Sequence, residues 1–136
     1  MTQVESKADF IALGDVICKN HQSRTEDLES QTIDLGRINS KAKAHQVAGL
    51  LRQQADNLAA EAHELEALQP PPGDTEKVGS ILSLIRAKEA LLDRWAAAYD
   101  ALNTAEIRAL QIRIGVATAR LRDGARAYGF KVCGQE

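Results

Sequence analysis

Aromatic residues, methionine and long apolar runs are all scarce in this sequence. Its 136 residues include one tryptophan, two tyrosines, two phenylalanines and one methionine. Alanine, leucine, glutamate, glutamine and arginine are abundant instead, and this bias favours helices over β-sheets. No apolar run approaches the roughly 18 residues that a membrane-spanning helix needs. The composition therefore predicts an all-α protein without a membrane span.

The first residues also lack a feature of exported proteins. The segment 1–7, MTQVESK, has no apolar core of the kind that signal peptides carry. Export would require that a targeting segment ahead of Met1 has been removed, and a lipid anchor on such a precursor is compatible with the sequence. A cytoplasmic protein would instead keep both of its cysteines reduced.

Motifs of enzyme active sites are missing as well. No serine lies in a Gly-x-Ser-x-Gly elbow, and there is no glycine-rich phosphate loop. Glu61, Glu64 and Glu66 surround His63 without the Glu-x-x-His spacing of di-iron bundles. We interpret these glutamates as a solvated helix face. The sequence therefore predicts a non-enzymatic protein with no catalytic residues.

Metal and cofactor sites are equally disfavoured. Cys18 and His21 share a helical face, but a closed zinc site needs about four ligands and no second such pair is present. His45 and His63 lie on one helix, about 27 Å apart, so they cannot meet around one ion. The only methionine is Met1, which excludes a haem held between Met and His. No metal and no cofactor are expected.

Apolar spacing predicts four helices, over about residues 6–30, 40–68, 74–102 and 104–128, followed by a tail at 129–136. Ser6 is the expected N-cap of the first helix. The three prolines at 70–72 end the second helix, and Asn103 with Glu106 forms a capping box before the fourth. Lys88 interrupts the apolar stripe of the third helix. The second helix carries an alanine-rich heptad seam: Ala44, Ala48, Leu51, Ala55, Leu58, Ala62 and Leu65.

Four helices of matched length with short links favour a single domain, residues 1–136, folded as an antiparallel up-down-up-down four-helix bundle. In that arrangement the fourth helix is expected to lie beside the first. Several glycines fall inside the predicted helices, where each costs about 0.5–1 kcal/mol relative to alanine. We interpret them as points of close helix contact; the alternative is that some make room for a ligand or a kink. They are Gly14, Gly49, Gly79, Gly115 and Gly124.

Cys18 and Cys133 are the only two cysteines and allow two interpretations. Either they form a disulfide that pins the C-terminal tail to the first helix, or they are two buried thiols. Cys18 lies about 18 Å along the first helix. Five extended residues after Tyr128 span about 17 Å, so the tail can fold back far enough for the bridge. Such a bridge would stabilise the fold by up to about 4–5 kcal/mol.

The charge is unevenly distributed along the chain. Residues 1–102 hold 11 Lys/Arg and 16 Asp/Glu, a net charge of −5, whereas residues 103–136 hold 6 and 3, a net charge of +3. Within the basic part, Arg113, Arg120 and Lys131 cluster only loosely, while Arg122 and Arg126 lie on a different line. Because the whole chain is slightly acidic, we do not expect nucleic-acid binding.

Three segments carry a resemblance to a known group of proteins. Residues 10–18 end in Ile-Cys, residues 65–74 contain Leu-x-x-Leu-x-Pro-Pro, and residues 125–134 contain Tyr-Gly-x-x-x-Cys-Gly. Together they make the chain similar to a group of uncharacterised exported proteins and lipoproteins of actinobacteria. The resemblance implies export and a Cys18–Cys133 bridge, and it implies no activity.

Three functional hypotheses follow. The first is an extracytoplasmic, non-enzymatic bundle that acts as a protein-interaction or structural module with an unknown partner. The second is a carrier that holds a small apolar ligand in the helix seam near Trp95 and Tyr99. The third is a cytosolic regulator or nucleic-acid binder, which would have free thiols. The sequence does not choose an oligomeric state.

Overall fold

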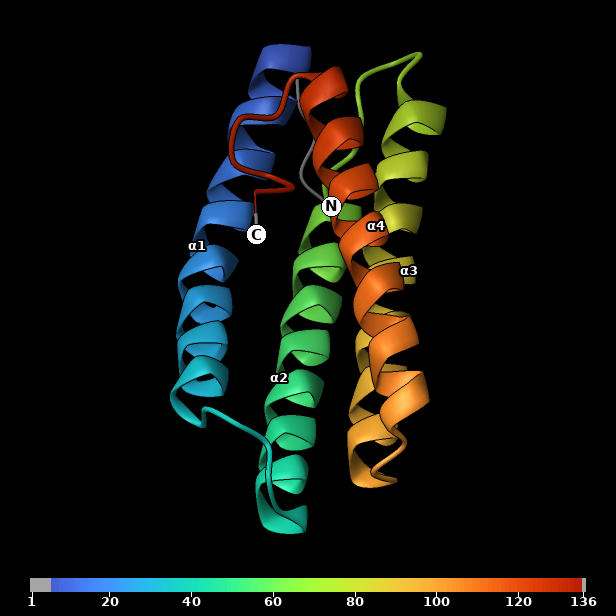
Figure 1. The fold of residues 1–136 in the computed structure, drawn as a ribbon. Coiled ribbons are helices and arrows are strands. Elements are labelled where there is room, and N and C mark those ends of the chain that lie inside the picture. Colours follow the sequence, from blue (N-terminus) through green and yellow to red (C-terminus); the bar gives the residue numbers. More distant parts are fainter. Residues whose placement is uncertain (1–5, 136) are drawn as a thin grey trace.

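The computed structural model describes residues 6–135, and every regular element in this part of the chain is an α-helix. Successive helices run antiparallel to one another (Figure 1). This confirms the predicted all-α, up-down-up-down four-helix bundle. Within the described residues, no helix has the length and apolarity needed to cross a membrane. The helices are α1 (Lys7–Asp34), α2 (Lys41–Glu66), α3 (Thr75–Asp100) and α4 (Thr104–Tyr128).

Side chains cap the first turns of the helices by accepting hydrogen bonds from backbone N–H groups that have no partner within the helix. Ser6 Oγ accepts a hydrogen bond from the Asp9 amide at 3.1 Å, and Asn103 Oδ1 accepts one from the Glu106 amide at 3.1 Å. Both caps were predicted. Asp74 precedes α3 without capping it. Its carboxylate instead accepts a hydrogen bond from the Tyr128 hydroxyl at 2.7 Å and so ties the start of α3 to the end of α4.

Helix α1 extends beyond its expected end near residue 30 and stops at Asp34. Ser30 and Thr32 are poor helix formers and favoured an early end, because such side chains compete for backbone hydrogen bonds. In the structure the Thr32 hydroxyl donates to the Leu28 carbonyl oxygen at 2.9 Å, which is compatible with a continuing helix. The last turn of α1 therefore projects Ile33 outward with 76% of its surface exposed.

The core is built around α2 and α3. All seven residues of the predicted alanine-rich seam of α2 are buried, which confirms the seam. Small alanine side chains let neighbouring helices approach closely, and the leucines between them fill the space that remains. α2 packs against both α1 and α3, and α3 also packs against α4.

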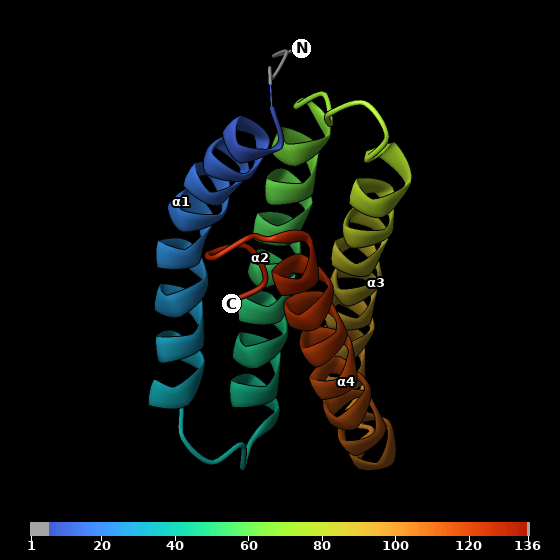
Figure 2. The ribbon, with the colours of Figure 1, turned by 90° about the horizontal axis from the view of Figure 1, so that it is seen from above.

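Helix α4 does not pack against α1, contrary to the expectation for a closed ring of helices. Over the described residues, no Cα atom of α4 lies within 8 Å of a Cα atom of α1. At one end of the molecule the C-terminal tail, residues 129–135, lies between the two helices (Figures 1 and 2). The bundle is thus closed by the tail at that end rather than by a helix–helix contact.

The tail fits between α1 and α4 because a glycine allows close approach at each contact, Gly14 of α1 on one side and Gly134 of the tail itself on the other. A Cβ atom on Gly14 of α1 would lie 2.6 Å from Cε1 of Phe130. Gly134 has a φ of +84°, which favours glycine, and a Cβ atom there would lie 3.0 Å from the Cα atom of Arg122 in α4. The backbone of each helix therefore touches the tail directly.

The interpretation of the helical glycines as close helix contacts is wrong at most positions. A Cβ atom on Gly49, Gly79 or Gly115 would meet nothing within 4 Å. Gly124 faces another helix, with Leu84 Cδ1 at 3.2 Å, and Gly14 faces the tail and also Leu65 of α2, with Cδ2 at 3.6 Å. Nothing in the structure explains the other three glycines.

Candidate ligand-binding pocket

A pocket of about 340 Å³ opens at the end of the molecule away from the tail, where α1 and α4 stay apart. Its volume falls within the range of about 300–1,000 Å³ that is typical of small-molecule sites. All four helices contribute to its lining. The residues are Glu29, Thr32, Ile33, Val47, Leu51, Gln54, Lys88, Leu92, Trp95, Tyr99, Ile114 and Thr118.

The walls of the pocket are mainly apolar. Leu51 of α2 and Leu92 of α3 are each 2% exposed, and Ile114 of α4 is 8% exposed. These side chains belong to the same faces that form the bundle core. In a closed four-helix bundle, contact between α1 and α4 would cover these side chains. Here α1 and α4 are too far apart to do so. The core therefore ends in an open, apolar concavity.

Trp95 and Tyr99 form an aromatic part of the wall. They lie one turn apart on α3, with ring centroids 5.8 Å apart and ring planes tilted by 52°. The indole Nε1 of Trp95 donates a hydrogen bond to the carbonyl oxygen of Ile107 in α4 at 3.1 Å, which fixes the ring. Burial raises the pKa of the Tyr99 hydroxyl, so this group is neutral at pH 7 and can donate a hydrogen bond.

Polar side chains enter the lining from each helix: Glu29 and Thr32 from α1, Gln54 from α2, Lys88 from α3 and Thr118 from α4. Lys88 is buried, with 8% of its surface exposed. A few polar groups in a mostly apolar wall are typical of sites that orient a ligand.

Trp95 and Tyr99 were predicted at this seam from the sequence, but Lys88 was not. This lysine was predicted only to interrupt the apolar stripe. However, residues 88, 92, 95 and 99 follow the four-three spacing of one helix face. That spacing could have placed Lys88 on the wall. No such spacing predicted that Ile33 lines the pocket, because the first helix was expected to end near residue 30.

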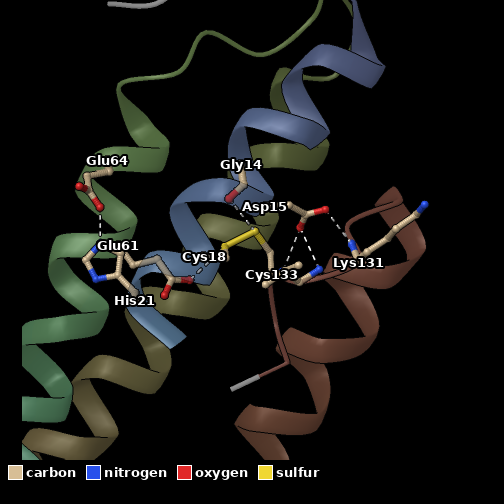
Figure 3. The surroundings of a disulfide bond; sticks show 9 residues. Gly14, Asp15, Cys18, His21, Glu61, Glu64, Lys131 and Cys133 are labelled. Atoms are coloured by element: carbon tan, nitrogen blue, oxygen red, sulfur yellow. Dashed lines mark hydrogen bonds and ion pairs between the residues drawn. A yellow bond between two sulfur atoms is a disulfide. The ribbon is translucent and has the colours of Figure 1, made fainter. Parts of the chain in front are cut away.

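The opposite end of the molecule holds the disulfide. Cys18 and Cys133 are bonded, with Cα atoms 5.1 Å apart and a sequence separation of 115 positions. Both are buried, with 0% and 3% of their surfaces exposed. The carboxylate of Asp15 points toward the tail (Figure 3) and accepts hydrogen bonds from three successive backbone amides, those of Lys131, Val132 and Cys133, at 2.9–3.1 Å. One covalent bond and three charge-assisted hydrogen bonds thus hold the tail on α1.

Of the three glutamates predicted to form a solvated face, Glu64 and Glu66 are exposed, but Glu61 is not. Glu61 is 1% exposed, and its Oε1 lies 3.4 Å from the Cys18 sulfur (Figure 3). Glu61 lies one turn from Leu58 and Leu65 on the buried side of α2, so its helix position carries it inward. Glu64 pairs with His21 of α1, whose Nδ1 lies 2.8 Å from Asn57 Oδ1. These contacts join α1 to α2.

The histidines and cysteines are dispersed. Cys18 is committed to the disulfide, and His45 binds Asp100, with Nδ1 2.6 Å from Oδ1. Hydrogen bonds from His45 and then Arg52 lower the pKa of Asp100. His63 is exposed. Within residues 6–135, no group of three or more His, Cys, Asp or Glu side chains is arranged to hold a metal ion.

Comparisons of this chain with protein-family models, curated proteins and solved structures find no match. The resemblance to exported actinobacterial proteins therefore stays a prediction. The candidate site is defined by its own geometry alone.

Proposed function

We propose that this protein is a non-enzymatic binding protein that holds a small apolar molecule in the pocket between α1 and α4. The observation that carries the proposal is the apolar concavity of about 340 Å³, to which all four helices contribute. Exposed apolar surface costs free energy in water, and a ligand that covers it recovers that free energy.

The chemistry of the lining indicates the type of ligand. The tilted rings of Trp95 and Tyr99 offer contact area to a flat or branched apolar group. Gln54 and Thr118 can each form a hydrogen bond with a polar substituent. We therefore expect an apolar molecule with one polar end.

The proposal includes an extracytoplasmic location. A buried disulfide between distant segments is typical of oxidising compartments, because cytoplasmic thiols are kept reduced. The resemblance in the three sequence segments favours the same location. Intact mass after alkylation tests it: protein taken from its native cells should gain no label unless reductant is added. Two labels without reductant would contradict this location.

The single tryptophan makes the pocket directly observable. Trp95 is the only tryptophan in the chain, so energy transfer from it reports a bound fluorophore. The probe is 1-anilinonaphthalene-8-sulfonate, an apolar dye with an anionic end. We expect its emission to rise on excitation of Trp95, and small apolar molecules should displace it. Absence of both effects would overturn the proposal.

Two matched variants of α4 locate the bound dye. Thr118→Phe places a large side chain in the pocket lining and should abolish energy transfer. Gln111→Phe adds the same side chain at an exposed position outside the pocket and should leave transfer intact. Circular dichroism checks that both variants fold. Equal dye binding by the two folded variants would refute a site in this pocket.

A further inference from the structure

A second apolar groove follows the outer seam between α3 and α4. A hollow of about 330 Å³ lies near the start of α3, and another of about 310 Å³ lies farther along the same two helices. Leu84 lines both hollows, which therefore adjoin, and we call the two together the α3/α4 seam. Its lining is Lys7, Lys77, Ser80, Ile81, Leu84, Ala87, Leu91, Ile112, Arg113, Val116, Ala117, Arg120, Gly124, Ala127 and Tyr128.

The seam exposes large apolar side chains beside small ones. Ile112 is 69% exposed and Val116 is 47% exposed. The small side chains of Ala87 and Ala117 line the same surface between them and leave a hollow. A flat surface would touch the exposed residues and leave this space empty, whereas the side chains of a helix can fill it.

The charge of the seam has one sign. Its lining includes Lys7, Lys77, Arg113 and Arg120 and contains no acidic residue. None of these four makes an ion pair with another described residue. Lys7 lies over the Tyr128 ring, with Nζ 4.5 Å from its centroid. The seam thus presents apolar and cationic groups together.

The arginines of α3 outside the seam behave differently. Arg86 pairs with Glu66 and Glu89, and Arg94 pairs with Glu106. These pairs neutralise the positive charge on that part of the surface. Arg86 and Arg94 are thus neutralised, whereas the four cations that line the seam make no ion pair with another described residue, and they favour a partner that carries negative charge.

We propose that the α3/α4 seam binds an acidic amphipathic helix of another protein. Leucine-like side chains at three-four spacing would enter the hollows, and glutamates or aspartates beside them would face Lys7, Lys77, Arg113 and Arg120. The seam runs from Ile112 to Ala127 on α4, about 22 Å, which matches a helix of roughly 15 residues.

The test uses two synthetic helical peptides of about 18 residues. Both carry leucines at heptad spacing; one has glutamates flanking the leucines and the other has lysines in their place. Binding of the fluorescently labelled peptides to the full chain is followed by anisotropy. We expect the glutamate peptide to bind, with an affinity that falls as salt rises, and the lysine peptide to bind at least about tenfold more weakly. Equal affinity for both peptides would overturn the proposal.

Matched charge reversals on α4 locate the bound peptide. The double variant Arg113→Glu/Arg120→Glu alters the seam and should weaken binding of the glutamate peptide about tenfold or more. The double variant Arg108→Glu/Arg126→Glu makes the same change of charge at exposed positions outside the seam and should have little effect. Equal loss in both variants would mean that only net charge matters, which contradicts the proposal.

Apolar substitutions provide an independent check. Ile112→Ser removes an exposed apolar side chain from the seam, whereas Leu102→Ser removes one that is 51% exposed elsewhere. Only Ile112→Ser should weaken peptide binding. Thr118→Phe, which fills the pocket between α1 and α4, should leave peptide binding unchanged, so the two sites are tested separately.

Two other occupants of the seam are outcomes of the same experiment. Vesicles of phosphatidylcholine and phosphatidylglycerol that bind the wild type but not Arg113→Glu/Arg120→Glu, in the absence of peptide binding, would assign the seam to an anionic membrane. Sedimentation that shows a dimer of the wild type and a monomer of that variant would assign it to a second copy of this chain. Either result would overturn the proposal.

Discussion

The gap between α1 and α4 is filled in one half of the molecule and open in the other. In one half the C-terminal tail occupies the gap and brings Phe130, 5% exposed, and Cys133, 3% exposed, into the core. In the other half no segment of the described chain fills it, and Trp95, Tyr99 and Ile114 line an open pocket. The same four helices thus produce a closed core where a short peptide covers them and a binding site where nothing does.

This difference shows what keeps the pocket open. α2 is the only helix whose Cα atoms approach those of α1 within 8 Å in the described chain. The tail then sets how far α1 stands from α4, because it lies between them (Figure 2). If the tail were released, α1 would be free to move relative to α4. The tail in the filled half of the gap therefore determines the shape of the pocket in the open half.

Removal of the disulfide should have the largest effect. In Cys18→Ala/Cys133→Ala the unfolded chain is no longer cross-linked over 115 residues, and we expect a loss of about 4–5 kcal/mol of unfolding free energy. Urea denaturation monitored by circular dichroism measures it. Energy transfer to the dye should also fall, because α1 is released. Unchanged stability would mean that the tail does not hold the two helices.

Asp15→Asn should have the next largest effect. The substitution removes one of the two carboxylate oxygens that accept three tail amides, so we expect a loss of about 2 kcal/mol of unfolding free energy. Asp27→Asn is the control: Asp27 is also on α1, but its carboxylate is exposed and bonds to Arg24 and Gln31 on the surface. This control should change stability by less than about 0.5 kcal/mol. Similar losses in both would argue against a role of Asp15 in docking the tail.

Glycine-to-alanine substitutions should change the free energy of unfolding in opposite directions in different parts of the molecule. Gly14→Ala brings a Cβ atom to 2.6 Å from Phe130, so we expect a net loss of about 1–2 kcal/mol of unfolding free energy. Gly49→Ala meets no atom within 4 Å and should stabilise the protein by about 0.5–1 kcal/mol. Thermal denaturation of both variants measures the difference. A stabilising Gly14→Ala would show that Phe130 packs elsewhere.

Tyr128→Phe should lower the unfolding free energy at neutral pH by only about 1 kcal/mol, because it removes one hydrogen bond to Asp74. Its pH dependence is more informative. Burial, followed by the hydrogen bond to Asp74, raises the pKa of Tyr128 above the ordinary value of 10.0. The unfolded tyrosine ionises first, so the wild type should lose stability as pH rises above 10. Tyr128→Phe should lose less stability than the wild type over this pH range. The loss that remains should come from Tyr99, whose pKa is raised by burial. Parallel pH profiles would contradict this account.

Periodic features were the most predictable part of the fold. The α2 seam, the Ser6 and Asn103 caps and the order of the four helices depend on side chains close together in sequence, and the structure confirms them. The Cys18–Cys133 pairing was predicted as one of two alternatives, because only two cysteines are present.

The gap between α1 and α4 was not predictable from these patterns. Apolar spacing shows which face of a helix is buried, but it does not give the distance between two helices that share no direct contact. Glu61 was predicted on a solvated face and Lys88 as an interruption of the apolar stripe, although both are buried. Long-range packing decided the gap, whereas helix spacing alone already places these two charged residues on buried faces.

The separation of the two cysteines has a consequence for biosynthesis. Because Cys133 comes 115 positions after Cys18, a ribosome must polymerise α2, α3 and α4 before the second sulfur exists. Until then Cys18 is a lone thiol, open to exchange with any disulfide that it encounters. The disulfide can therefore form only in a chain whose four helices have all been synthesised. An oxidase could not form this disulfide on a nascent chain before Cys133 has been added.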